Sequence, residues 1–172
     1  MSCVNDAVVI IDVQTGEVAA GGPESVLVSN GIGSCVAVVL ADRRLPLAGI
    51  AHIMLPGRAP DTRTTGRTRY AEDGIESLVG LMADKGAATG ALNACIAGGG
   101  NVLLRPDDVI CALNVDSVRT ALEARNIHLA ASSVGGVLRR RVRVAVKNGT
   151  VLCGVGDSPE IVLYDFMKGV CP

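Results

Sequence analysis

A thiol and an imidazole are the side chains in this sequence best suited to covalent chemistry. Cys35 follows the glycine-rich run Gly31-Ile32-Gly33-Ser34, and His52 is one of only two histidines in the 172-residue chain. A cysteine and a histidine in contact form an activated nucleophile, because the imidazole takes the thiol proton and later protonates the leaving group. The glycines would let the backbone N–H groups of Gly33 and Ser34 approach a developing oxyanion.

A β-hairpin is expected to bring Cys35 and His52 together. Two apolar runs, residues 35–41 and 47–55, flank a turn at residues 42–46. A turn centred near Arg44 puts Cys35 opposite Ile53 or one of its neighbours, so that His52 lies beside it. A slip of one residue decides whether both side chains share a face, and the spacing leaves this open. Taken alone, a core thiol and a structural histidine are the commoner interpretation of such a pair.

The remaining elements indicate a single-domain α/β (α+β) layered sandwich over residues 1–172, with a mixed β-sheet and two main helices. Strands are expected at residues 7–13, 25–28, 92–97, 127–132, 141–146 and 150–155, the last two joined through Asn148-Gly149. Apolar spacing predicts helices at residues 69–85 and 115–125, with Asn114 as the N-cap of the second. Residues 57–69 carry no apolar periodicity and are expected to form a solvated, mobile loop.

Composition excludes several classes of function. The sixteen basic and seventeen acidic residues nearly balance, and three aromatics provide no stacking platform, so nucleic-acid binding is not expected. No apolar run approaches the roughly 20 residues of a membrane span, and no signal peptide is recognisable, so no membrane insertion and a cytoplasmic location are expected. Metal-ligand spacing is absent among the six scattered cysteines and two histidines. Nucleotide binding is also not expected, because no Lys-Ser or Lys-Thr follows the glycine run Gly98-Gly99-Gly100. The cysteines are expected as thiols, and neither a metal nor a cofactor is expected.

Two sequence blocks, in combination, resemble those of a known family. They are Gly31-Ile32-Gly33-Ser34-Cys35-Val36-Ala37-Val38 and Gly49-Ile50-Ala51-His52-Ile53-Met54-Leu55-Pro56. Further similar stretches follow in order at residues 69–72, 94–100, 114–118 and 135–136. In order and spacing they cover most of residues 25–152, and the chain resembles the CheD family of chemoreceptor glutamine deamidases.

The resemblance implies a Cys–His–Thr triad in a layered α/β fold. Cys35 matches the nucleophile and His52 the general base and acid. The third position is Thr in the family pattern but Ser29 here, which keeps the hydroxyl that orients the imidazole and loses the methyl that restricts its rotamer. The implied substrates are glutamines on the cytoplasmic helices of methyl-accepting chemoreceptors, and a CheC-type phosphatase is an implied partner.

Two other functions stay open on the sequence. One is a non-enzymatic CheD-like adaptor that binds a CheC-type phosphatase or a receptor, and the change to Ser29 is the feature in its favour. The other is a different cysteine amidohydrolase, acting on small-molecule amides or on another protein, which would use the same Cys35 and His52 in a closed pocket. The segment after Val155 has no assigned counterpart in the family, and residues 137–141 lack the Gly-Arg pair often found there.

Overall fold

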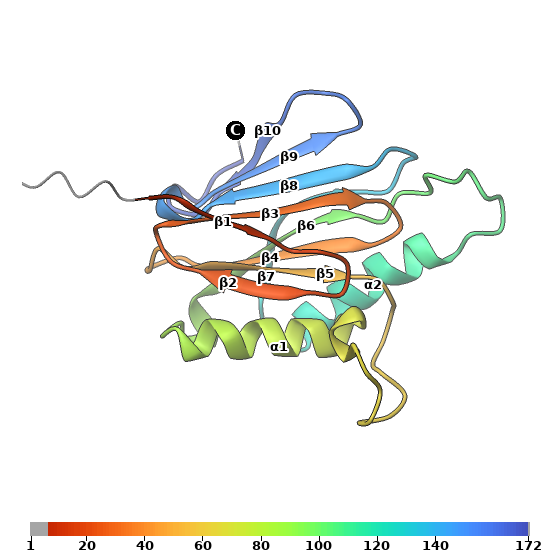
Figure 1. Ribbon diagram of the computed structural model, residues 1–172, viewed down its shortest axis with the longest axis horizontal. Helices are drawn as coiled ribbons and strands as arrows, with labels where there is room; N and C mark the ends of the chain where they lie inside the picture. Colours follow the sequence, from red (N-terminus) through yellow and green to blue (C-terminus); the bar gives the residue numbers. More distant parts are fainter. Residues whose placement is uncertain (1–6, 172) are drawn as a thin grey trace, which may run out of the picture.

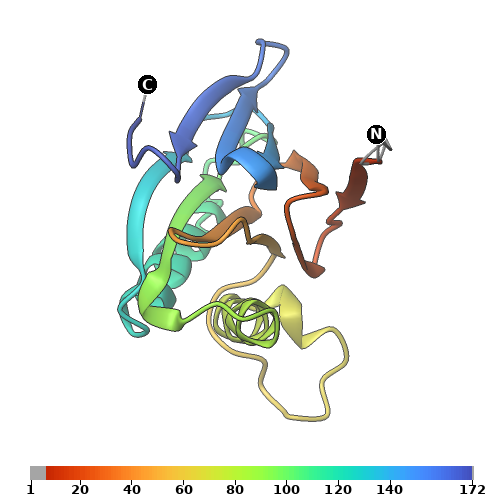
Figure 2. The same cartoon turned by 90° about the vertical axis from the view of Figure 1, so that its left-hand side faces the viewer.

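The protein is built in three layers, as seen in a computed structural model that describes residues 7–171. An outer sheet packs on an inner sheet, and two helices cover the far side of the inner sheet (Figures 1 and 2). The strands are β1 (Val9–Asp12), β2 (Val18–Gly21), β3 (Ser25–Ile32), β4 (Val36–Asp42), β5 (Ala48–Ile53), β6 (Leu92–Gly98), β7 (His128–Val134), β8 (Arg140–Ala145), β9 (Thr150–Val155) and β10 (Ile161–Asp165). The helices are α1 (Ala71–Asp84) and α2 (Ile110–Glu123), with short 3-10 helices η1 (Arg67–Arg69), η2 (Thr89–Ala91) and η3 (Val146–Asn148).

The outer sheet has the strand order β1-β3-β8-β9-β10, with β1 parallel to β3 and the other pairs antiparallel. Leu27, Val144 and Val151 project from it into the core between the sheets. The C-terminal segment completes this sheet through β10, which the sequence did not predict. Tyr164 and Phe166 from this segment stack edge to face with ring centroids 5.0 Å apart and pack against the same core. The tail therefore closes one side of the fold.

The inner sheet has the order β2-β5-β4-β6-β7 and is the layer that carries the hairpin. Every residue of β4 and β5 is buried, because the outer sheet covers one face and the helices cover the other. Strands enclosed on both faces have continuous apolar sequences rather than alternating ones. The unbroken apolar runs of residues 35–41 and 47–55 are thus explained by their central position.

Helix α1 packs on the inner sheet through the apolar stripe that its sequence predicts. Ile75, Leu78 and Met82 are fully buried there, and each contributes roughly 1.5–3 kcal/mol by leaving water. Gly86, with φ of 100°, follows the helix end as expected. Within residues 7–171, no helix combines the length and the apolar character needed to cross a membrane.

The α+β sandwich with two main helices is confirmed, while two details of the sequence prediction are wrong. The strands form two mixed sheets of five strands each, not one sheet, and β2 joins the inner sheet unpredicted. The second helix begins at Ile110 and not at Val115, so that Asn114 lies in its second turn and is fully buried. Asn114 therefore does not cap the helix, and its side chain has a different role that is described below.

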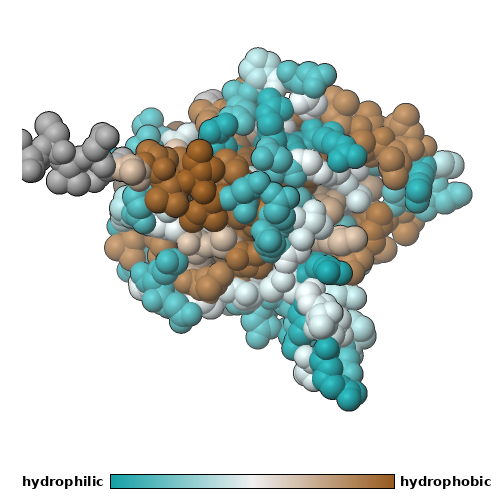
Figure 3. Space-filling model, viewed as in Figure 1, coloured by the Kyte–Doolittle hydropathy of each residue, from teal (hydrophilic) through white to brown (hydrophobic). Residues whose placement is uncertain are grey.

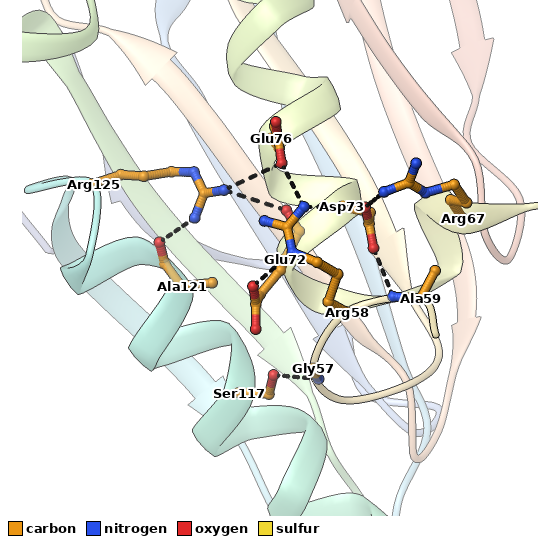
Figure 4. Close-up of polar contacts among 10 residues, drawn as sticks. All are labelled: Gly57, Arg58, Ala59, Arg67, Glu72, Asp73, Glu76, Ser117, Ala121 and Arg125. Atoms are coloured by element: carbon orange, nitrogen blue, oxygen red, sulfur yellow. Dashed lines mark hydrogen bonds and ion pairs between the residues drawn. The ribbon is translucent and has the colours of Figure 1, made fainter. Parts of the chain in front are cut away.

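The loop at residues 57–69 is anchored by charges at both of its ends (Figure 4). The Asp73 carboxylate accepts hydrogen bonds from the Ala59 N–H (2.7 Å) and from the guanidinium of Arg67. Arg58 pairs with Glu72 at 3.0 Å and with Glu76 at 3.1 Å, and the Gly57 N–H donates to the Ser117 hydroxyl of α2 at 2.7 Å. Two of the loop arginines thus face α1 of the same chain and hold the segment that follows β5.

Candidate active site

A hydrogen bond between the two sheets holds His52 in place. Ser29 on β3 projects inward from the outer sheet, and its Oγ lies 2.9 Å from Nδ1 of His52 on β5. The same hydroxyl donates to the backbone carbonyl of Val13 at 2.8 Å. Ser29 is fully buried and His52 is 2% exposed, so water does not compete for these bonds.

This arrangement determines the tautomer of the imidazole. A serine hydroxyl has one proton, and the carbonyl of Val13 accepts it because a carbonyl can only accept. Ser29 Oγ must then accept the Nδ1–H of His52, which leaves Nε2 unprotonated. Nε2 is buried and has no hydrogen-bond partner among residues 7–171. An imidazole held in this way presents a free lone pair, which is what a general base requires.

Cys35 lies on the same face of the inner sheet as His52. In the β4–β5 ladder Ala37 pairs with His52 and Val36 with Ile53, so the register extends to place Cys35 opposite Met54. Side chains alternate along a strand, and Cys35 and Ala37 therefore point the same way. Cys35 is half-buried and packs against the core between the sheets. Cys35 directly precedes β4, and continuing the register makes it a diagonal neighbour of His52, a relation in which Cα atoms are roughly 7–8 Å apart. The hairpin register is the expected one, and contact between the Cys35 and His52 side chains stays a prediction.

Burial keeps both groups neutral at rest. Loss of solvation raises the pKa of the Cys35 thiol, the Cys35 backbone N–H opposes this by a smaller amount, and Cys111 adds the smallest effect, an increase. Loss of solvation also lowers the pKa of His52 below its ordinary 6.5, against a smaller opposite effect from the Val13 carbonyl. The pair is therefore a thiol and a neutral imidazole near pH 7, and not a preformed thiolate–imidazolium ion pair.

The glycine-rich turn before Cys35 leaves three backbone donors free. Within residues 7–171 the N–H groups of Gly33, Ser34 and Cys35 make no hydrogen bond to a backbone or side-chain acceptor. Their carbonyls are occupied instead, since the Gly99 N–H bonds the Cys35 oxygen at 2.7 Å and the Gly100 N–H bonds the Gly33 oxygen at 2.8 Å. Gly99 has a φ of 62°, a conformation that disfavours other residues. Successive free N–H groups beside a nucleophile are suited to binding an oxyanion.

Cys35 opens into a small cavity of about 210 Å³. The cavity is lined by the turn that carries Cys35 (Gly31, Gly33 and Ser34), by Gly100, Val102 and Leu103, and by two charged residues, Asp108 and Arg139. Sites that enclose a free small molecule typically measure about 300–1,000 Å³. A smaller recess that opens at the surface is suited to a single inserted side chain. Among residues 7–171 no three His, Cys, Asp or Glu side chains are grouped so as to hold a metal ion.

Asn114 is a site residue that the sequence prediction misassigned. From α2, its Nδ2 donates to the Ser34 carbonyl at 2.9 Å and to the Met54 carbonyl at 3.0 Å. It thereby joins the start of β4, next to Cys35, to the end of β5, two residues after His52. A signal was available in the sequence: Asn114 interrupts the apolar helical stripe of Cys111, Val115 and Val118, and a polar residue in such a stripe requires a specific partner.

The remaining cysteines have other environments. Cys95, Cys111 and Cys153 are buried free thiols, and burial raises the pKa of Cys95 to about 12. Cys171 is exposed at the end of the described chain, and Cys3 lies outside the described residues. Among the cysteines within residues 7–171, only Cys35 is half-buried and lies beside free backbone N–H donors.

The fold is an α+β sandwich whose central hairpin has Cys35 and His52 near one end. Residues 54–154 match the family described as CheD chemotactic sensory transduction. The chain is 40% identical over 152 residues to a protein of Chlorobium luteolum named "Probable chemoreceptor glutamine deamidase CheD", a match that covers 88% of this chain and 76% of the relative. It is 34% identical over 149 residues to the "Chemoreceptor glutamine deamidase CheD" of Thermotoga maritima, covering 85% of this chain and 94% of the relative. The chain belongs to the CheD family.

Proposed function

We propose that this protein is a chemoreceptor glutamine deamidase of chemotaxis adaptation, with Cys35 as nucleophile, His52 as general base and acid, and Ser29 as the residue that orients His52. The names of the CheD relatives supply the reaction and the receptor substrate. The observation that carries the assignment of roles is the hydrogen bond from His52 Nδ1 to Ser29, which leaves Nε2 free as a base. The whole chain, residues 1–172, is proposed to act as one deamidase domain.

The first half of the reaction forms a thioester. A glutamine side chain enters the cavity, Nε2 of His52 takes the Cys35 proton, and the thiolate attacks the amide carbon. The N–H groups of Gly33, Ser34 and Cys35 are suited to stabilise the resulting oxyanion, because they have no other partner. The imidazolium then protonates the amide nitrogen, the C–N bond breaks, and ammonia leaves.

The second half restores the enzyme. His52 takes a proton from water, the resulting hydroxide attacks the thioester carbon, and the C–S bond breaks. Cys35 regains its proton from the imidazolium, and the substrate residue leaves as glutamate. In sum, amide and water give the carboxylic acid and ammonia, which at neutral pH exchange a proton to become carboxylate and ammonium. Both steps use the same neutral imidazole, which agrees with a His52 pKa that burial keeps low.

The surface around the cavity suits a helix as the partner. Leu103, Leu104, Val137 and Leu138 are all at least half-exposed, on the loops that follow β6 and β7. Figure 3 shows apolar side chains gathered at the right-hand end of the molecule, where Figure 1 places these loops. The recess at Cys35 continues into a neighbouring groove that shares Gly31, Val102 and Arg139 with it. An apolar rim around a small recess would take one side chain while the helix that bears it packs outside.

Both alternatives from the sequence lose support. The adaptor hypothesis depended on Ser29 in place of Thr, and the Ser29 hydroxyl bonds the imidazole as a triad member would. The hypothesis of an amidohydrolase for small molecules requires an enclosing pocket, and the recess at Cys35 is small. A cytoplasmic location, a CheC-type phosphatase as partner and the lack of nucleic-acid binding are further parts of the proposal, the last supported by the balanced charge.

The direct test is incubation of the protein with the cytoplasmic fragment of a chemoreceptor, followed by peptide mass spectrometry. Conversion of specific glutamines to glutamate, above the level in fragment incubated alone, is the expected result. A fragment that a homologous deamidase converts but that this protein leaves unchanged would contradict the proposal.

A further inference from the structure

Two opposite charges line the recess at Cys35, and the proposed reaction does not use either of them. Asp108 lies just before α2, and Arg139 lies just before β8, so they approach the recess from different elements. Arg139 is exposed and solvated, whereas Asp108 is half-buried. Neither forms an ion pair within 4.0 Å in the described part of the chain, 7–171. The Asp108 carboxylate is therefore a charge without an ion-pair partner in the recess that Cys35 also lines.

One oxygen of Asp108 has a structural partner and the other does not. Oδ1 accepts the Ile110 N–H at 3.1 Å, which holds the carboxylate at the beginning of α2. Oδ2 makes no hydrogen bond to any residue between 7 and 171. The carboxylate is therefore fixed in orientation by one oxygen, while the other remains able to accept a hydrogen bond from a group in the recess.

From this geometry we infer that Asp108 is a specificity-determining residue that makes the recess accept a side-chain amide and reject a side-chain carboxylate. The inference rests on the proposed function of Cys35. A glutamine amide has an NH₂ group that can donate to Asp108 while its oxygen faces the free N–H groups of the turn. A glutamate side chain has two carboxylate oxygens that share its negative charge. Whichever oxygen faces the N–H groups of the turn, the other lies against the Asp108 carboxylate.

Rejection of the carboxylate has a consequence for turnover. The substrate of the proposed reaction is neutral and its product is an anion of nearly the same shape, so shape alone cannot separate them. Repulsion from the fixed Asp108 carboxylate distinguishes the two, because it acts only on the charged product. The same repulsion favours release of glutamate from the recess once the thioester is hydrolysed. Arg139 is exposed, so water screens its charge more strongly than the charge of the half-buried Asp108.

The experiment compares Asp108→Asn with the matched control Asp107→Asn, an exposed neighbouring carboxylate that does not line the recess. A receptor fragment with its target glutamines and the same fragment with glutamates at those positions serve as probes. In Asp108→Asn we expect kcat/KM for the glutamine fragment to fall about tenfold and inhibition by the glutamate fragment to strengthen about tenfold. Asp107→Asn should leave both values unchanged.

A second variant and a binding measurement keep the test decisive. Asp108→Ser retains an acceptor for the Ile110 N–H and removes the charge, so it controls for damage to the beginning of α2. In a Cys35→Ala background, which cannot turn over, binding of the two fragments reports the preference directly. If the glutamine fragment binds no better than the glutamate fragment, or if Asp108→Asn and Asp108→Ser leave the preference intact, Asp108 does not have this role. If the protein binds and converts neither fragment, the proposed function fails instead.

Discussion

At the scale of single residues, the site depends on one hydroxyl that makes two hydrogen bonds. Ser29 donates to Val13 and accepts from His52, and this order of donors fixes which imidazole nitrogen is free. The family resemblance raises the question of whether Ser can stand in the Thr position. The hydroxyl, which Ser and Thr share, is the group that makes both of these hydrogen bonds.

Ser29→Ala is predicted to impair catalysis and stability together. The change leaves the Val13 carbonyl and the His52 Nδ1–H buried without partners, at a cost of about 1–3 kcal/mol in the free energy of unfolding. The imidazole is also freed to adopt the wrong tautomer, so kcat should fall roughly tenfold to a thousandfold. Chemical denaturation and initial rates measure the two effects.

Ser29→Thr is the matched control, because it keeps the hydroxyl and adds only the methyl. Activity equal to or above that of the wild type is expected. A large loss in Ser29→Thr with an intact fold, or full activity in Ser29→Ala, would count against the orienting role.

The low pKa of His52 predicts how activity depends on pH. Deamidation requires the neutral imidazole, so kcat/KM should fall with decreasing pH only as His52 is protonated, at a pKa below the ordinary value of 6.5. Initial rates from about pH 5 to pH 8 measure this limb. An acid limb centred above 6.5 would show that burial does not control the titration of His52.

The same pKa difference links protonation to stability. In the unfolded chain His52 titrates near 6.5, and in the folded protein it titrates lower, so between these values the unfolded state binds more protons. The contribution of His52 to the free energy of unfolding is therefore largest above the unfolded pKa and decreases as the pH falls through this window. His52→Gln removes the titration and should flatten this part of the stability profile.

At the scale of secondary-structure elements, the site depends on how α2 joins the ends of β4 and β5. Asn114 bonds the Ser34 and Met54 carbonyls, and the Ser117 hydroxyl bonds the Gly57 N–H just beyond β5. The anchored loop in Figure 4 adds Asp73, whose pKa stays below its ordinary value because the hydrogen bonds from Ala59 and Arg67 outweigh its burial. These contacts hold the hairpin end that carries the thiol and the imidazole.

Asn114→Ala is predicted to lower the free energy of unfolding by about 2–4 kcal/mol, because two buried carbonyls lose their donors. The deamidation rate should fall by more than the loss of folded protein accounts for, because the distance between Cys35 and His52 is no longer held fixed. Rates normalised to the folded fraction measure this second effect. Asp116→Ala, an exposed change on the same helix, should leave both quantities near their wild-type values. If the rate of Asn114→Ala falls only in proportion to the folded fraction, Asn114 stabilises the fold and does not position Cys35 and His52.

The elements differ in how well their sequences predict them. The hairpin and α1 are predictable because a continuous apolar run and a helical stripe are local signals. The beginning of α2 is not, because Asn114 has the side chain of an N-cap and sits within a buried face. The short strand β2, Val-Ala-Ala-Gly, offers little β-branched character, and its place beside β5 depends on pairing distant in sequence.

At the scale of the whole molecule, the two sheets must be held at a fixed separation for the site to exist. Ser29 comes from one sheet and His52 from the other, so the geometry of the proposed site depends on the core between them. No local pattern predicts that strands divide into two sheets, and the Ser29–His52 contact could be expected only from the family resemblance. The hairpin spacing, in contrast, predicts that Cys35 and His52 lie near one another, although it leaves open whether they share a face.

Phe166→Ala tests the contribution of the C-terminal segment to this core. Phe166 is 4% exposed and packs against Tyr164 and the core between the sheets, so its truncation should cost about 3–5 kcal/mol in the free energy of unfolding. Met167→Ala is the matched control, because Met167 is exposed and should change stability by no more than about 0.5 kcal/mol. Equal stability of both variants, measured by denaturation, would mean that the tail does not support the core.

The central claim is that Cys35 performs the deamidation. Cys35→Ala is compared with wild type and with Cys171→Ser, which removes the exposed thiol, on a receptor fragment analysed by site-resolved mass spectrometry. We predict glutamine-to-glutamate conversion by wild type and by Cys171→Ser, and none above background by Cys35→Ala with an unchanged fold. Conversion by Cys35→Ala at the wild-type rate would contradict the mechanism.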